Sequence, residues 1–519
     1  MTAQVFTAIL VVCFFALMIG IGLYCRRHAT NVDGFVLGGR SVGPWLTAFA
    51  FGTSYFSAVI FVGYAGQFGW NFGLASTWIG LGNAFIGSLL AWNILGRRTR
   101  LMTQSINSKT MPDFFEKRFD SKALKIAASV IVFIFLIPYT ASLYNGLSSL
   151  FNIAFSIPYW VCILVMAVLT GVYVIFGGYM ATAINDFIQG IIMLVGIVAV
   201  IVAVLNQNGG LMESTALLAE VGGWEYTSFF GPDPVFLIFV VLLTSLGTWG
   251  LPQMVGKFYA ISNEAAIRKG TLISTLFAII VAGGCYFLGG FGRLFMTQAD
   301  VTAKGFDSII PSMLSRLSPY IIGIVIVLVL SASMSTLSSL VLTSASTLAL
   351  DVWIPAYKKR EVSEKKKLLL MRILIVFFIL LSAAIAILKD SIWSSSMFIA
   401  QMMGVSWGAL AGAFLAPFLY GLYWKKTTRP AVWCSFVFGV GMMLCQLMIS
   451  MKLFTVSGFL GFVFKNSLYS GVFAMVGGLI IVPIVSLLTQ KQKPQNTDEL
   501  FSCYETEVTV PASSSLEEK

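Results

Sequence analysis

The chain has 519 residues, of which 58% are apolar and only 11% are charged, and its formal net charge is +11. Many apolar runs reach the roughly 18–20 residues that a helix needs to cross a bilayer. This excludes a soluble globular protein and predicts an all-α polytopic membrane protein with the lipid bilayer as its surroundings. The positive charge is explained by loops beside the spans, so no nucleic-acid partner is expected. The single histidine, His28, excludes a histidine-based metal or proton-relay site.

Thirteen transmembrane helices are expected from the apolar runs. In chain order they cover about residues 5–24, 45–67, 75–95, 123–150, 158–177, 182–205, 233–256, 270–292, 319–350, 368–388, 391–423, 431–450 and 468–489. The polar tail 490–519 is expected to be disordered.

The lysines and arginines of the loops predict a multi-pass protein of the cell membrane with its N-terminus outside and its C-terminus in the cytoplasm. In that orientation the loop 206–232, which has three Glu and no Lys or Arg, lies outside. The basic residues that also fall outside are Arg293, Lys304, Arg316, Lys389, Lys452 and Lys465.

The second to sixth spans and the seventh to eleventh spans form two blocks of five that begin on opposite sides of the membrane. Each block opens with an interrupted helix, at Gly52, Thr53 and Ser54 in the first block and at 247–252 in the second. Glycine and proline inside a membrane helix leave backbone N–H and C=O groups without helical hydrogen bonds, and these groups must then face protein or a polar cavity. Paired breaks in inverted halves predict a binding site near the midplane, although close glycine packing is the alternative.

This organisation divides the chain into six units. They are a first helix with its cytoplasmic loop (1–44), a first inverted repeat (45–205), an extracytoplasmic loop (206–232), a second inverted repeat (233–423), two accessory helices (424–489) and a cytoplasmic tail (490–519).

Hydroxyl groups are concentrated in the ninth span, where residues 331–347 include seven serines and three threonines. Ala332, Ser335, Thr336 and Ser339 recur at helical spacing and share one face. Membrane helices use Ser and Thr for close packing and for bonds to their own carbonyls. The alternative is that these oxygens hold a monovalent cation.

Asp186 is the acidic residue that is embedded near an apolar span. It either caps a helix that begins near Thr182 or supplies negative charge to a cation site. The sequence has no Walker motif, no paired carboxylates and no Cys/His metal spacing in a soluble segment. No catalytic residue is therefore assigned, and the protein is not expected to be an enzyme. Transport driven by an ion gradient is the class that remains.

Four segments carry a resemblance to a known family: DGFVLGGRSVGPW (33–45), MPDFFEKRF (111–119), GGYMATAINDFIQ (177–189) and STLSSLVLTSASTLALDVW (335–353). In this order they resemble the sodium:solute symporter family over about residues 5–490. The resemblance implies thirteen helices, a leucine-transporter-like core of two inverted five-helix repeats, alternating access and Na⁺ as the coupling ion.

The resemblance also implies two sets of ion ligands. A first Na⁺ would be bound by the carbonyls of Thr53, Phe56 and Ala332 and the hydroxyls of Ser335 and Thr336. A possible second Na⁺ would be bound by Asp186, Ser335, Ser338 and Ser339.

The solute is less defined, because the chain departs from the family at several positions. Tyr55 stands where proline-type carriers have an acidic residue, and Thr244 and Thr248 stand where they have Trp and Tyr. Asn185 stands where family members commonly have a Thr before the Asp. Span 123–150 lacks the Arg that sialic-acid-type carriers have in the third core helix. The residues expected to bind the solute are Ser54, Ser57, Tyr139, Thr248 and Trp249.

The sequence thus predicts a sodium-coupled secondary active symporter that imports a small polar organic solute with one or two Na⁺. The solute would be of the amino acid, carboxylate, vitamin or sugar class, and no obligate protein partner is evident. The alternatives are a proton-coupled symporter and, further off, a channel or a non-transporting solute sensor on the same fold.

Overall fold

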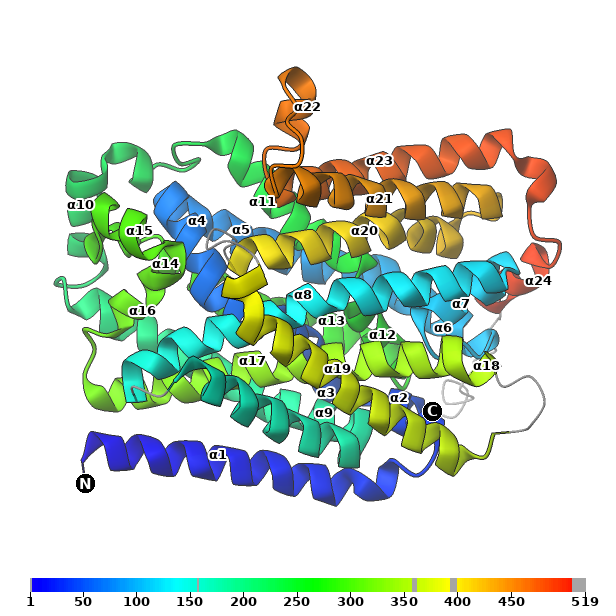
Figure 1. The fold of residues 1–519 in the computed structure, drawn as a ribbon, viewed down its shortest axis with the longest axis horizontal. Coiled ribbons are helices and arrows are strands. Elements are labelled where there is room, and N and C mark those ends of the chain that lie inside the picture. Colours follow the sequence, from blue (N-terminus) through cyan, green and yellow to red (C-terminus); the bar gives the residue numbers. More distant parts are fainter. Residues whose placement is uncertain (1, 156–157, 357–361, 393–398, 506–519) are drawn as a thin grey trace, which may run out of the picture.

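The computed structural model describes residues 2–155, 158–356, 362–392 and 399–505, and Figure 1 shows long helices packed side by side. Within these ranges the structure is helical apart from loops and one isolated bridge between Val42 and Ile261. Among the described residues, ten helices are long and apolar enough to cross a membrane, or eleven if a bent pair is one span. The expected all-α membrane fold is confirmed, whereas the number of thirteen spans stays a prediction.

The first half of the chain, up to α9, consists of short and long helices in this order. They are α1 (Ala3–Cys25), α2 (Val32–Leu37), α3 (Pro44–Tyr55), η3 (Val59–Tyr64), α4 (Ala65–Phe72), α5 (Thr77–Gly82), η5 (Asn83–Leu90), η6 (Trp92–Gly96), α6 (Arg97–Ser105), α7 (Met111–Phe119), α8 (Lys122–Phe155) and α9 (Tyr159–Asn206).

The second half continues with shorter elements between long helices. Its elements are α10 (Leu211–Gly222), α11 (Pro234–Leu246), η8 (Gly247–Gly250), α12 (Pro252–Ala260), α13 (Glu264–Ala278), η9 (Ile279–Gly283), α14 (Gly284–Gly289), α15 (Gln298–Lys304), α16 (Ile309–Leu314), α17 (Pro319–Thr347), η12 (Leu348–Trp353), α18 (Ile354–Ala356), α19 (Glu364–Ile392), α20 (Ile399–Tyr423), α21 (Arg429–Ser450), α22 (Gly458–Val463), α23 (Ser467–Leu488) and α24 (Thr497–Phe501).

The first broken helix is interrupted after α3, where Phe56 adopts an extended backbone conformation (φ −85°, ψ 114°). The break was expected at Gly52, Thr53 and Ser54, but these residues are helical, so the expected position is wrong. Gly52 serves packing instead, because a Cβ atom there would lie only 2.5 Å from the ring of Phe277.

The second broken helix is interrupted where it was expected, between η8 and α12. Leu251 is extended (φ −88°, ψ 119°), as the ring of the following Pro252 favours. The helices on the two sides of this break are bent by 47°. Phe56 and Leu251 therefore have similar backbone conformations at the two interruptions.

Helix α9 would be about 72 Å long if it were straight, which exceeds the thickness of a bilayer. It is kinked at Gly178 (φ 55°, ψ −147°), between the two expected spans 158–177 and 182–205. A Cβ atom at Gly178 would lie 2.8 Å from the carbonyl oxygen of Phe35. Asp186 lies well inside the second part of α9, so the interpretation of Asp186 as a helix cap is wrong.

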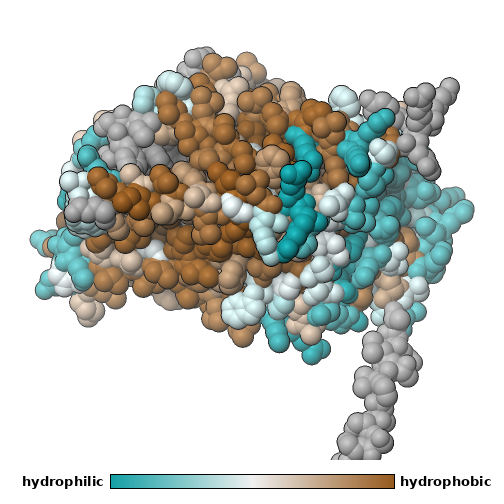
Figure 2. Space-filling view, turned by 90° about the horizontal axis from the view of Figure 1, so that it is seen from below, coloured by the Kyte–Doolittle hydropathy of each residue, from teal (hydrophilic) through white to brown (hydrophobic). Residues whose placement is uncertain are grey.

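The outer surface separates into an apolar face and a polar end. Figure 2 shows a broad hydrophobic face, with hydrophilic residues gathered toward the right. In Figure 1 the right-hand end carries α2, α6, α7 and α24, and we call it the basic end because Arg97, Arg98, Lys117 and Arg429 lie in or beside these elements.

The tail was expected to be disordered over 490–519, and this expectation is wrong for its described part, 490–505. Phe501 of α24 is buried, and the guanidinium carbon of Arg118 lies 5.1 Å from the centre of its ring. The remaining residues, 506–519, lie outside the described residues.

Candidate functional site

Five oxygen atoms converge between the end of α3 and the middle of α17. The hydroxyl oxygen of Ser335 lies 3.2 Å from the carbonyl oxygens of both Thr53 and Ala332. The hydroxyl oxygen of Thr336 lies 3.1 Å from the carbonyl of Thr53, 3.4 Å from that of Phe56 and 3.2 Å from that of Ala332. All five residues are buried. We call these atoms the first oxygen set.

The first oxygen set has more acceptors than protons. The last carbonyls of a helix lack intrahelical partners, and the break after α3 turns the carbonyls of Thr53 and Phe56 toward α17. Two hydroxyl protons, those of Ser335 and Thr336, are shared among three carbonyl oxygens. Such a neutral, oxygen-only cluster with spare lone pairs at a helix break suits a small monovalent cation.

Two residues of the predicted second set, Asp186 and Ser339, lie beside a lysine. The ammonium nitrogen of Lys257 lies 3.6 Å from a carboxylate oxygen of Asp186 and donates a hydrogen bond of 3.0 Å to the hydroxyl of Ser339. Ser338 donates to the carbonyl of Ser335 in its own helix at 2.9 Å. The structure thus brings Asp186 and Ser339 together through Lys257, while the hydroxyl of Ser335 faces the first oxygen set.

Sequence reasoning missed Lys257, because this residue lies just beyond residue 256, the end predicted for the seventh span. The chain resumes a helix at Pro252, so Lys257 lies in the second turn of α12 and is buried. One signal was present in the sequence: Lys257 is the sole charged residue between Asp233 and Glu264.

An aromatic and hydroxyl group surrounds the first break. The ring of Trp407 in α20 contacts Tyr139 and Tyr55, with ring centres 6.0 Å and 5.8 Å away. The hydroxyl of Tyr139 lies beside Ser57 and Trp407. The hydroxyls of Tyr55, Ser57 and Tyr139 and the indole N–H of Trp407 are buried without a hydrogen bond of good geometry among the described residues. Buried polar atoms of this kind normally have partners, so they mark a place where a polar ligand can bind.

The other residues expected at the solute site face elsewhere. The hydroxyl of Ser54 shares a hydrogen bond of 2.7 Å with that of Ser339. The hydroxyl of Thr248 donates to the carbonyl of Ser245 at 2.8 Å, and the indole of Trp249 donates to the carbonyl of Ile86 in η5 at 3.0 Å. Of the five predicted residues, the structure therefore groups Ser57 with Tyr139, and it adds Tyr55 and Trp407, of which Trp407 was missed.

A cavity extends from the Lys257–Ser339 contact toward the basic end. Its lining residues are Val36, Leu37, Lys109, Thr110, Met111, Tyr179, Thr182, Pro252, Gln253, Gly256, Lys257, Tyr259, Ser339, Leu342, Thr343, Ser346 and Thr347. The cavity thus links the buried ammonium of Lys257 to the segment before α7.

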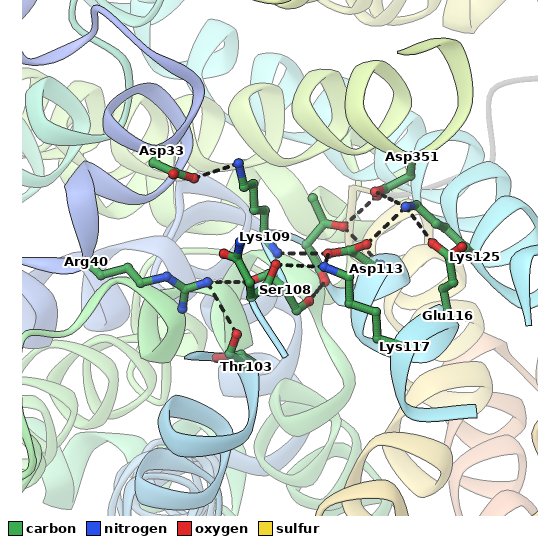
Figure 3. Close-up of polar contacts among 12 residues, drawn as sticks. Asp33, Arg40, Thr103, Ser108, Lys109, Asp113, Glu116, Lys117, Lys125 and Asp351 are labelled. Atoms are coloured by element: carbon green, nitrogen blue, oxygen red, sulfur yellow. Dashed lines mark hydrogen bonds and ion pairs between the residues drawn. The ribbon is translucent and has the colours of Figure 1, made fainter. Parts of the chain in front are cut away.

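A cluster of charged side chains lies beside Thr110, which lines this cavity. Figure 3 shows the members of the cluster. Lys125 lies 3.0 Å from Asp113, 2.7 Å from Glu116 and 3.7 Å from Asp351, and Lys117 lies 2.9 Å from Asp113. Thr110 donates a hydrogen bond of 2.6 Å to Asp351. We call these charged residues the inner cluster.

Further polar contacts beside the inner cluster join segments that are far apart in the chain. Arg40 donates to the carbonyl oxygens of Ser108 at 2.5 Å and Tyr259 at 3.3 Å, and Lys109 pairs with Asp33 at 2.8 Å.

The carboxyl group of Asp113 is held in its ionised form. Burial raises its pKa, but the positive charges of Lys125 and Lys117 together outweigh burial, so the pKa lies below its ordinary value. Asp113 therefore stays ionised and binds α7 to α8.

Comparisons of the sequence with known proteins indicate one family. A sequence model of the sodium:solute symporter family matches residues 35–439. The sodium/proline symporter of Staphylococcus aureus strain NCTC 8325 / PS 47 is 28% identical over 496 residues, which cover 93% of this chain and 93% of that protein.

Two solved structures have a similar fold. A Na⁺-coupled sialic acid symporter in a substrate-bound, outward-open state has a TM-score of 0.74 at 16% identity, over 93% of this chain and 98% of its own. Mhp1, a nucleobase-cation-symport-1 family transporter in a closed conformation with bromovinylhydantoin bound, has a TM-score of 0.53 at 13% identity, over 90% and 98%. At these identities the likeness concerns the fold alone.

Proposed function

This chain belongs to the sodium:solute symporter family and is a sodium-coupled symporter, and we propose that it binds Na⁺ in the first oxygen set and imports a small polar organic solute. The observation that carries this proposal is the convergence of three carbonyl oxygens and two hydroxyl oxygens across the break after α3. A bound Na⁺ would supply the positive charge that these spare lone pairs attract.

Coupling between ion and solute follows from adjacent residues. The carbonyl of Phe56 belongs to the first oxygen set, and Ser57, the next residue, lies beside Tyr139. An ion that fixes the carbonyl of Phe56 also fixes the backbone that carries Ser57. Na⁺ would thus stabilise the arrangement that binds solute, which is the thermodynamic requirement for coupled binding.

The solute is proposed to bind against Tyr55, Ser57, Tyr139 and Trp407. These side chains offer aromatic faces, hydroxyls and an indole N–H, and none of them is charged. They suit a small polar organic molecule of the amino acid, carboxylate, vitamin or sugar class, and the lack of a charged side chain favours a neutral or zwitterionic member of these classes. Ser54, Thr248 and Trp249 would support this site from the surrounding helices.

The orientation places the N-terminus outside and the basic end in the cytoplasm, as the loop charges favour. The cavity that reaches from Lys257 to Lys109 would then face the cytoplasm and provide the inner exit path for solute and ion. At a potential of 100 mV, negative inside, each Na⁺ that enters gains about 2.3 kcal/mol.

The experiment begins with a thermal-shift screen of amino acids, carboxylates, vitamins and sugars on the purified protein, in sodium and in choline buffer. A true solute should raise the Tm, because it binds the folded state, and should do so far more in sodium. The labelled solute is then tested in proteoliposomes for sodium-driven uptake and for counterflow.

Sodium-dependent uptake with counterflow is the expected result. Uptake that persists without sodium and follows pH would overturn the proposal in favour of proton coupling. Gradient collapse without counterflow would indicate a channel, and binding without movement would indicate a sensor.

A further inference from the structure

Lys257 places a fixed positive charge deep among the helices. Its side chain is buried, and its ammonium donates to Ser339 at 3.0 Å and lies 3.6 Å from Asp186. Asp186 is also fully buried. Taking a charge out of water is costly unless an opposite charge lies close by. Each of these residues therefore supplies the counter-charge that the other requires.

Four separate elements meet at this pair. Lys257 belongs to α12, Asp186 to α9 and Ser339 to α17, and the hydroxyl of Ser339 also shares a hydrogen bond of 2.7 Å with Ser54 at the end of α3. Ser54 directly follows Thr53, whose carbonyl belongs to the first oxygen set. The ammonium of Lys257 is thus connected, through two hydroxyls, to the first oxygen set.

We propose that the ammonium of Lys257 is a tethered cation that takes the place of a second Na⁺ beside Asp186 and Ser339, so that the protein couples solute to one Na⁺ in each cycle. The inference rests on the proposed function, since it concerns how many sodium ions that function uses. Charge, and not a shortage of oxygen atoms, opposes a free Na⁺ in addition: both carboxylate oxygens of Asp186 lack a hydrogen bond among the described residues, but Lys257 already balances their charge, and Ser338 donates into its own helix. A second cation there would lie next to a like charge in a poorly screened interior.

A tethered cation differs from a bound ion in what it does during a cycle. Na⁺ can leave through the inner exit path, whereas Lys257 remains attached to α12. The pair with Asp186 therefore contributes no net charge to transport, and a neutral solute should carry one positive charge inward. The same pair holds α12 against α9 and α17, which form the walls of the cavity.

The test counts the sodium ions that bind to the purified full-length protein at saturation, measured by equilibrium dialysis with radioactive sodium in choline buffer. We expect one ion in the wild type. Lys257→Met leaves the carboxylate of Asp186 without its cation, so this variant should bind two ions. Lys257→Arg retains a cation and should bind one, and the double variant Asp186→Asn, Lys257→Met should return to one.

Each outcome of this measurement either supports or contradicts the inference. Two ions in the wild type would overturn this inference and leave the proposed function standing, whereas no bound sodium in the wild type would overturn the proposed function and the inference with it. One ion in a folded Lys257→Met protein would also overturn the inference. Should that variant not fold, the charge moved per neutral solute by the wild type decides, since one charge supports the inference and two contradict it.

Discussion

Thr336 illustrates how a single hydroxyl contributes to an ion site. Its oxygen lies within 3.4 Å of three carbonyl oxygens, two from α3 and the residue after it and one from its own helix. One proton cannot satisfy three acceptors at once, so the carbonyls keep spare lone pairs. The neighbouring Ser331, also in α17, instead donates to the carbonyl of Val327 at 2.7 Å and takes no part in this convergence.

Replacing Thr336 by Val should raise the sodium concentration for half-maximal uptake by about tenfold, as expected if the loss of one ligand costs about 1.4 kcal/mol. The maximal rate at saturating sodium should change much less. The measurement is sodium-dependent solute uptake in proteoliposomes that contain equal amounts of each protein.

Two variants serve as controls for this prediction. Thr336→Ser retains the hydroxyl, and Ser331→Ala removes one from the same helix outside the first oxygen set. Both should keep a sodium dependence close to that of the wild type. A Thr336→Val protein with wild-type sodium dependence would rule out a ligand role for Thr336.

At the scale of elements, the second half of α3 packs against α13. Gly52 is helical, and its missing side chain lets the ring of Phe277 approach the helix. The backbone leaves the helix only at Phe56, where its carbonyl turns toward α17. The last turns of α3 therefore lie between two neighbours, α13 on one side and α17 on the other.

Substituting Gly52 by Ala should lower the free energy of unfolding by about 1–3 kcal/mol, because an added methyl group overpacks a filled interface. A Cβ atom there would meet Phe277 at 2.5 Å. The measurement is the Tm of the purified protein in detergent. Gly20→Ala is the matched control, since the same atom in helix α1 meets nothing within 4 Å. Equal Tm values for the two variants would contradict this account of α3.

At the scale of the whole molecule, the inner cluster and the ion pair beside it connect segments that are far apart in the chain. Asp113 in α7, Lys125 in α8 and Asp351 in η12 lie together, and the pair of Asp33 with Lys109 connects α2 to the same region (Figure 3). The apolar surface in Figure 2 holds the helices in the bilayer, whereas these ion pairs fix the ends of helices at one side. The segments that carry the family resemblance at 33–45, 111–119 and 335–353 therefore meet in space.

The lowered pKa of Asp113 gives a pH-dependent contribution to stability. A carboxyl whose folded pKa is depressed stabilises the protein above its unfolded pKa, and this contribution is lost as the pH falls through the folded pKa. Asp113→Asn should thus have a lower Tm than the wild type at neutral pH, and the difference should shrink below about pH 4.

The measurement is the Tm of the wild type and of Asp113→Asn between neutral and acidic pH. Glu220→Gln provides the control, since Glu220 is exposed in α10, and its Tm should follow that of the wild type throughout. A constant difference between Asp113→Asn and the wild type across this pH range would contradict the proposed ionisation.

The sequence by itself determined the features that depend on composition and local spacing. Apolar runs identified the long helices, because each helix needs its own hydrophobic length, and Pro252 marked the second break, because proline restricts the residue before it. The hydroxyl pattern of α17 predicted that Ser335 and Thr336 share a face. The ordered segments of the family resemblance predicted the fold that the structural comparison then confirmed.

Only the tertiary structure decided which side chains meet across elements. Helical periodicity does not reveal that Lys257 in α12 reaches Asp186 in α9, or that Trp407 in α20 lies against Tyr139 in α8. Nor does the sequence show that Gly52 packs against the ring of Phe277, far along the chain, while the helix continues to Tyr55. Local sequence shows where a helix can form or bend, whereas a buried charge acquires its partner only when the packed helices exclude water and bring that partner within reach.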